Sequence, residues 1–117
     1  MKNLFYHEPH PMAREEAEAA FASNDPQEIA SALVNVAFHD PDWYWVQKKC
    51  LGFAGNDIAA VRQIAVTSLG HLARIHRKLD LESVLPVLNE LALDPEVQVK
   101  DALDDIQMYM KVDVRRK

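Results

Sequence analysis

The sequence predicts an all-helical protein, and three observations lead to that fold class. First, the 117 residues include only 3 Gly against 6 Pro, so tight glycine turns are scarce. Second, no Asn-Gly or Asp-Gly pair occurs, and no stretch alternates polar residues with β-branched apolar ones. Third, Asp or Asn residues precede apolar-periodic stretches at five places, as they do at the starts of helices.

Five sites carry this signal for a helix start. Three of them are Asp-Pro pairs, in which the Asp carboxylate accepts from the free amides of the first turn and Pro occupies the first helical position. The sites are Asp25-Pro26, Asp40-Pro41, Asn56-Asp57, Asp80-Leu81 and Asp94-Pro95. At the first of them, Glu28 follows Asp25 by three residues, as in a capping box.

Reading forward from these starts predicts six helices in three antiparallel pairs. Their expected ranges are 12–22, 26–38, 41–54, 57–76, 81–93 and 95–110. Apolar residues recur within them every three or four positions, as on one face of a helix. In the last five helices these residues are Ile29, Leu33, Val36 and Ala37; Trp43, Val46, Cys50 and Phe53; Val61, Ala65, Leu69 and Leu72; Leu81, Val84, Leu85, Leu88 and Leu91; and Val99, Ala102, Leu103, Ile106 and Met110. The fourth helix has further apolar residues, which predicts neighbours on two sides.

Length and composition restrict the class of protein. A chain of 117 residues forms one ordinary domain, expected here over 12–110 with an irregular segment at 1–11 and a basic tail at 111–117. The formal net charge of −5 argues against nucleic-acid binding. One cysteine cannot form an intramolecular disulfide, and no secretion leader or bilayer-spanning apolar run is found. We therefore expect a cytoplasmic protein that does not bind membranes.

A modest internal repeat connects the fourth and sixth predicted helices. A shift of 37 residues aligns Asp57 with Asp94 and brings the apolar positions of the two helices into register. The segment 85–97 reads LPVLNELALDPEV. It resembles the first helix and the turn of a HEAT repeat, with the internal Pro86, an Asp in the turn and a Val at the start of the second helix.

A second segment supports the same resemblance. The pattern of Asp57, Val61-Arg62, Ala65 and Leu69-Gly70 is similar to the second helix of a HEAT repeat. Together the two segments place the resemblance to the HEAT-repeat family over residues 41–110. It implies a short right-handed stack of about three antiparallel helix pairs, a HEAT-like α-α superhelix. It also implies a non-catalytic module that binds another protein.

Signatures of catalysis and of metal binding are missing. His71 and His76 lie five residues apart on one predicted helix, and a second cysteine for a zinc site is lacking. Cys50 is in register with the apolar residues of its helix, which predicts a buried, unreactive thiol. No Gly-rich phosphate loop, dinucleotide fingerprint or Gly-x-Ser-x-Gly motif occurs. We therefore expect neither an enzyme nor a bound cofactor or metal.

Two polar ridges are candidates for a functional surface. The ridge on the fourth helix is Gln63, Thr67, His71, Arg74 and Lys78, and the acidic ridge on the last helix is Gln98, Asp101, Asp105 and Met108 with Asp104 beside them. In a HEAT-like stack the two helices would be neighbours. The ridges are then either merely solvated surface or a partner-binding face. The candidate residues of such a face are His71, Arg74, Asp101, Asp104 and Asp105.

The consecutive aromatic residues Trp43, Tyr44 and Trp45 open the third predicted helix. Successive helical residues point about 100° apart, so the three side chains cannot all face one core. Trp43 falls on the apolar side, whereas Trp45 shares a face with Lys48 and Lys49. We expect Trp45 either to pack on the preceding helix or to be an anchor at the rim of an interface with a partner.

Three functions are consistent with these features. The chain is similar in size and charge to small immunity proteins that neutralise bacterial toxins, and an acidic inhibitor associates rapidly with a basic toxin domain. A generic HEAT-repeat adaptor or scaffold that binds an endogenous protein is the second candidate. A HEAT-like lyase or other enzyme subunit is the third. For the first candidate we expect a cytoplasmic monomer in the absence of the partner.

Overall fold

The protein is all-helical over the part of the chain that the computed structural model describes, residues 9–112, where it forms six α-helices and no strand. The helices are α1 (Arg14–Phe21), α2 (Pro26–His39), α3 (Trp43–Phe53), α4 (Ala59–His76), α5 (Leu81–Leu91) and α6 (Lys100–Met110). The predicted fold class and the order of the six helices are therefore confirmed. None of these helices is long and apolar enough to cross a bilayer within the described range.

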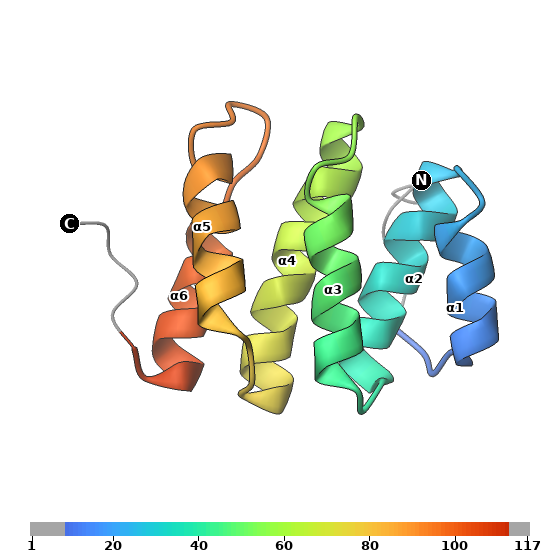
Figure 1. Ribbon diagram of the computed structural model, residues 1–117, viewed down its shortest axis with the longest axis horizontal. Coiled ribbons are helices and arrows are strands. Elements are labelled where there is room, and N and C mark those ends of the chain that lie inside the picture. Colours follow the sequence, from blue (N-terminus) through green and yellow to red (C-terminus); the bar gives the residue numbers. More distant parts are fainter. Residues whose placement is uncertain (1–8, 113–117) are drawn as a thin grey trace.

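The helices form two layers (Figure 1). One layer contains α2, α4 and α6, with α4 in the middle and packed against both neighbours. The other layer contains α1, α3 and α5; α1 packs on α2, and α3 packs on both α4 and α2. Because α4 contacts three helices, the predicted contacts on two of its sides are confirmed.

One continuous apolar core lies between the layers. Its largest fully buried apolar side chains include Leu33, Leu69, Leu72, Leu88 and Ile106. Cys50 is also fully buried in this core, as its register predicts. Burial raises the pKa of the Cys50 thiol to about 12. The thiol is therefore protonated at neutral pH and serves as a small apolar side chain.

Two helix starts agree with the sequence. The Oδ1 atom of Asp25 accepts a hydrogen bond from the amide of Gln27 at 3.0 Å, and Pro26 is the first residue of α2. The amide of Asp25 donates to the Ser23 hydroxyl at 3.1 Å, so Ser23 takes the role that a capping box assigns to Glu28. The fifth helix begins at Leu81, as predicted.

Two other starts lie two residues later than predicted. The carboxylate of Asp40 accepts from the amide of Asp42 at 2.8 Å, and Asp42 in turn caps α3 by accepting from the amide of Trp45 at 3.1 Å. Asn56 likewise accepts from the amide of Ile58 at 2.9 Å, directly before α4. Short Asp and Asn side chains that bond the amide two residues ahead form a turn, and this turn delays the helix.

The start of α6 was predicted five residues too early. Asp94 accepts from the amide of Glu96 at 2.9 Å through one carboxylate oxygen and from Arg62 Nε at 3.0 Å through the other. The amide of Gln98 donates to Gln63 Oε1 at 2.7 Å. These contacts fasten residues 95–99 to α4 as a non-helical segment, and the helix begins only at Lys100.

The ends of the chain are described in part. Of the irregular segment predicted at 1–11, residues 9–11 are described and are not helical, and the His10 amide donates to Asn35 Oδ1 at 3.0 Å. Of the basic tail predicted at 111–117, only 111–112 are described. The remainder of both segments lies outside the described residues.

Candidate partner-binding site

Helices α4 and α6 approach each other closely at Gly70. A Cβ atom at this position would lie 3.2 Å from the Ala102 Cα and 3.1 Å from the Asp105 Oδ2. Both separations are shorter than ordinary van der Waals contact, so the glycine is what allows the two helices to meet here. The Asp105 carboxylate therefore lies directly over the backbone of α4.

A groove opens beside this contact. It has a volume of about 290 Å³. Its lining is Gln63, Val66 and Thr67 from α4, Asp101, Ala102 and Asp105 from α6, and Gln98 from the segment before α6. We call this feature the α4–α6 groove. It brings together parts of the two polar ridges that the sequence predicts as neighbours, and that adjacency is confirmed.

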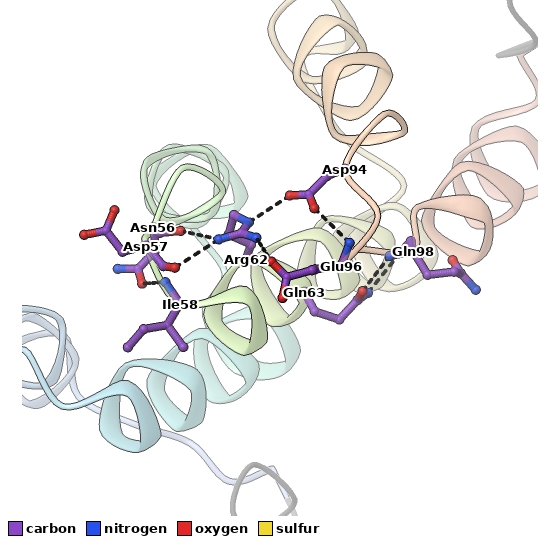
Figure 2. A network of polar contacts seen from close by, with 8 residues as sticks. All are labelled: Asn56, Asp57, Ile58, Arg62, Gln63, Asp94, Glu96 and Gln98. Carbon is purple, nitrogen blue, oxygen red and sulfur yellow. Dashed lines mark hydrogen bonds and ion pairs between the residues drawn. The ribbon is translucent and has the colours of Figure 1, made fainter.

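A hydrogen-bond network joins α4 to the loop before it and to the segment before α6 (Figure 2), and its residues Gln63 and Gln98 also line the α4–α6 groove. The side-chain amide of Gln63 donates to the Gln98 carbonyl oxygen at 3.0 Å, and the Gln98 amide donates back to Gln63 Oε1 at 2.7 Å. Arg62, one residue earlier, bonds Asp94 at 3.0 Å and the Asn56 carbonyl oxygen at 2.9 Å. The network ties two segments to α4, the loop before α4 and the segment before α6, and makes the end of the groove rigid.

The three aspartates of α6 have different surroundings. Asp104 pairs with Lys100 Nζ at 2.8 Å on the exposed side of the helix. Asp101 and Asp105 face the groove and have no ion-pair partner within residues 9–112. Burial raises the pKa of Asp105; the positive charge of Arg74 opposes this shift, and the neighbouring aspartates add to it.

His71 and Arg74 form a second cluster on α4, beside Phe38 of α2. The His71 and Phe38 rings meet edge to face, with centroids 4.7 Å apart. Burial, and then the charge of Arg74, lower the pKa of His71 to about 4, so the ring is neutral at neutral pH. Arg74 Nη2 therefore donates to His71 Nδ1 at 2.9 Å.

Trp45 lies between α3 and α1. Its half-buried ring packs against Phe21 of α1 at a centroid distance of 6.2 Å, and the Arg14 guanidinium lies over it at 3.9 Å. Arg14 pairs with Asp42 at 3.3 Å. The ring contact of Trp45 is thus with α1, whereas the sequence analysis expected the preceding helix, which is α2. Trp45 does not line the α4–α6 groove.

Two further hollows lie on the surface. One lies between α1 and α2 and has a volume of about 410 Å³; Glu16, Asp25 and Glu28 line it in part, and the Asp25 carboxylate is engaged in capping α2. The other lies between α3 and α5 and is lined in part by Leu51, Val87 and Leu91. No group of three or more His, Cys, Asp or Glu side chains within the described part of the chain is arranged to hold a metal ion.

The sequence analysis missed two residues of this site. Gln63 was assigned to a polar ridge, yet it is half-buried and bonded to a residue 35 positions later. Arg62 was noted only as part of the repeat pattern, although it connects three segments. The shift of 37 residues that aligns Asp57 with Asp94 is the signal that could have found Arg62, because it pairs the two loops that this residue bridges.

The fold and the groove define a small all-helical protein with a preformed surface groove. No protein-family model matches the sequence, and no curated protein is significantly similar to it. Among solved structures, the protein is similar to a chain in a crystal structure of a CDI complex from Cupriavidus taiwanensis LMG 19424. The two are 35% identical with a TM-score of 0.79, over 89% of this chain and 96% of that chain. The protein therefore belongs to the same family as that component of the CDI complex.

Proposed function

We propose that this protein is an immunity protein, which binds and neutralises the toxin of a CDI system. The observation that carries the proposal is the match to a chain of a CDI complex at 35% identity over almost the whole of both chains. A match of that extent includes the complete fold and is not confined to one motif. The protein acts by covering its partner and has no catalytic step of its own.

The face that carries the α4–α6 groove is the proposed toxin-binding face. It presents Asp101 and Asp105 in the groove near His71 and Arg74, with Asp104 outside the groove on the exposed side of α6, and the whole chain has a net charge of −5. A toxin that acts on a negatively charged substrate is basic around its active site, and an acidic face speeds association with such a surface. Covering that site would neutralise the toxin.

The packing of the helices supports a HEAT-like stack as the form in which this face is presented. Helices α2, α4 and α6 lie side by side in one layer, as the second helices of successive repeats do. Pro86 lies inside the first helix of the last pair, and Asp94 of that pair bonds Arg62 of the preceding one. A stack of this kind would present α4 and α6 to the toxin.

The edge formed by Trp45 is the second candidate for the binding face. The observation in its favour is the aromatic surface at the start of α3, where Tyr44 is 50% exposed. Trp45 itself is covered by Arg14 and bordered by Lys49, which pairs with Glu18 at 2.8 Å. Because this edge is already engaged within the molecule, we place the toxin at the α4–α6 groove.

Co-expression tests the proposed function directly. The toxin domain encoded by the gene directly upstream should arrest growth when expressed alone, and this protein should restore growth and co-purify with it. A toxin domain from an unrelated CDI system is the control and should be neither bound nor neutralised. Failure to bind or to protect would reject the proposal and leave the adaptor function, in which the partner is an endogenous protein.

A further inference from the structure

The α4–α6 groove presents the carboxylates of Asp101 and Asp105, and several of the hydrogen-bond donors around it are already engaged within the protein. The side-chain amide of Gln63 is engaged with the Gln98 carbonyl oxygen at 3.0 Å and with Thr67 Oγ1 at 3.3 Å. The backbone amide of Gln98 donates to Gln63, and that of Asp101 donates to Gln98 Oε1 at 3.1 Å. The carboxylates of Asp101 and Asp105 accept no hydrogen bond from the described residues.

Among the groups in the groove, the carboxylate of Asp105 would be stabilised most by a cationic partner. It is half-buried over Gly70, where burial disfavours its ionised form. The nearby Arg74 guanidinium is held instead by His71, at 2.9 Å, and by the face of Phe38, at 5.6 Å from the ring centroid. Asp105 thus has no ion-pair partner among residues 9–112, although the Arg74 guanidinium lies close enough to affect its pKa.

The lining of the groove is mostly polar, and Val66 and Ala102 form an apolar floor that is itself almost fully buried. The reciprocal hydrogen bonds between Gln63 and Gln98 hold one end, and the close contact of Gly70 with Ala102 holds the two helices together. A ligand therefore meets a preformed cleft with an apolar floor and two unpaired negative charges at its edge, which lowers the entropy cost of binding.

We propose that the α4–α6 groove receives one basic side chain of the toxin, an arginine or a lysine. Its charged end pairs with Asp105 and Asp101, and its aliphatic stem lies on Val66 and Ala102. Arginine and lysine combine these two chemistries in one side chain, whereas an apolar or acidic side chain would leave both carboxylates unpaired. The inference rests on the proposed function, since it takes the toxin to be the partner.

Two neighbouring aspartates provide a matched test. Asp105→Asn removes the charge inside the groove, and Asp104→Asn removes an equal charge on the exposed side, where it pairs with Lys100. Binding kinetics would be measured with the purified toxin domain encoded directly upstream, in an inactive form. Asp105→Asn should speed dissociation by roughly tenfold or more, because it removes a buried charge pair. Asp104→Asn should change dissociation by less than about threefold, its effect being confined to association at low salt.

Thermal melts of the unbound variants separate binding from folding. Asp105 has no ion-pair partner among the described residues, so Asp105→Asn should leave the melting temperature unchanged or raise it. Substitution of a residue with a purely structural role would lower both the stability of the protein and its affinity for the toxin. Higher stability with faster dissociation is therefore the combination that identifies Asp105 as a binding residue.

Substitutions on the toxin identify the inserted side chain. Each surface arginine and lysine of the toxin domain would be changed to alanine and combined with Asp105→Asn in a double-mutant cycle. One basic residue should show a coupling of about tenfold in affinity, and the others should be additive with Asp105→Asn. Equal effects of Asp104→Asn and Asp105→Asn, or the absence of any coupled residue, would overturn the groove assignment while toxin binding persists. Failure of the unaltered protein to bind the toxin would overturn the proposed function and this inference together.

Discussion

The Trp45 edge and the α4–α6 groove use the same kinds of charged residue in opposite ways. At the Trp45 edge, Glu18 pairs with Lys49 at 2.8 Å, and Asp42 pairs with Arg14 at 3.3 Å. The hydrogen bond from Lys49 lowers the pKa of Glu18, and the amide of Trp45 followed by Arg14 lowers that of Asp42. In the groove, Asp105 has no ion-pair partner among the described residues, and burial raises its pKa.

This difference separates the charges that are paired within the fold from the charge that we propose meets the partner. At the edge, partners in the same chain make the ionised carboxylates more favourable in the folded protein than in the unfolded chain. The ionised form of Asp105 is less favourable in the folded protein than in the unfolded chain, and no partner lies within ion-pair distance among residues 9–112. Whether the charges of a surface are paired is therefore a better guide to partner binding than the acidic character of that surface.

The largest expected effect comes from the core that supports both regions. Leu69 is fully buried in α4, the helix at the centre of the packing. Leu69→Ala should lower the free energy of unfolding by about 2–5 kcal/mol, through lost burial and the cavity left behind. Chemical denaturation measures the loss. A change below about 1 kcal/mol would mean that α4 is not the central helix, and the comparison of two regions on one rigid core would fail.

Substitution of Trp45 tests whether the Trp45 edge stabilises the fold and does not contact the toxin. Trp45→Ala should lower the free energy of unfolding by about 2–3 kcal/mol, less than for a fully buried tryptophan because the ring is half-exposed. The toxin dissociation rate should change by less than about threefold, since the edge lies outside the proposed interface. Tyr44→Ala is the control and should cost below about 1 kcal/mol. A large rise in dissociation with little loss of stability would instead make Trp45 a partner anchor.

A smaller loss of stability is expected when the hydrogen bonds between Gln63 and Gln98, at one end of the groove, are removed. Gln63→Ala removes the reciprocal hydrogen bonds to Gln98 and should cost about 1–2 kcal/mol of unfolding free energy. Gln107→Ala, on the exposed side of the same layer, is the control and should stay within about 0.5 kcal/mol. The result also decides between the interpretation of Gln63 as solvated ridge and its assignment to the groove wall. Equal effects at the two glutamines would favour the solvated ridge.

The smallest expected effect is a difference in pH dependence between the two regions. The raised pKa of Asp105 means that its ionisation weakens folding, so its charge destabilises the protein at neutral pH and this cost disappears as the pH falls through that pKa. Asp105→Asn should therefore stabilise at pH 7, and the gain should vanish in acid. His71 and Arg74 on α4, and Asp101 and Asp104 on α6, are the charged or titratable groups near Asp105.

Asp42 provides the comparison of opposite sign. Its pKa is lowered, so its charge stabilises the fold above the unfolded value and this contribution is lost as the pH falls through the folded pKa. Asp42→Asn should therefore destabilise at pH 7, and in acid it should differ little from the unaltered protein. Thermal melts of both variants between pH 3 and 7 measure the two trends. Trends of the same sign would contradict the distinction between paired and unpaired carboxylates.

Local sequence signals determined the fold class and the existence of all six helices. Apolar spacing of three or four residues identified the core positions of α4, including Leu69, and the register of Cys50 identified its burial. The cap of α2 was also determined locally, because Asp25 and the amide it binds lie two residues apart. Features of this kind depend on neighbours along the chain, so they can be predicted from the sequence.

Only the tertiary structure decided where α6 begins and what the polar ridges do. The start of α6 depends on bonds from Asp94 to Arg62 and from Gln98 to Gln63, which join residues 32 and 35 positions apart. Helical spacing placed Asp104 and Asp105 together on one acidic ridge, yet packing directs Asp105 over Gly70 and leaves Asp104 to its neighbour Lys100. The sequence reveals which carboxylates exist. The packing of α6 on α4 determines which of them has no cation within ion-pair distance among residues 9–112, because that depends on distances between separate helices.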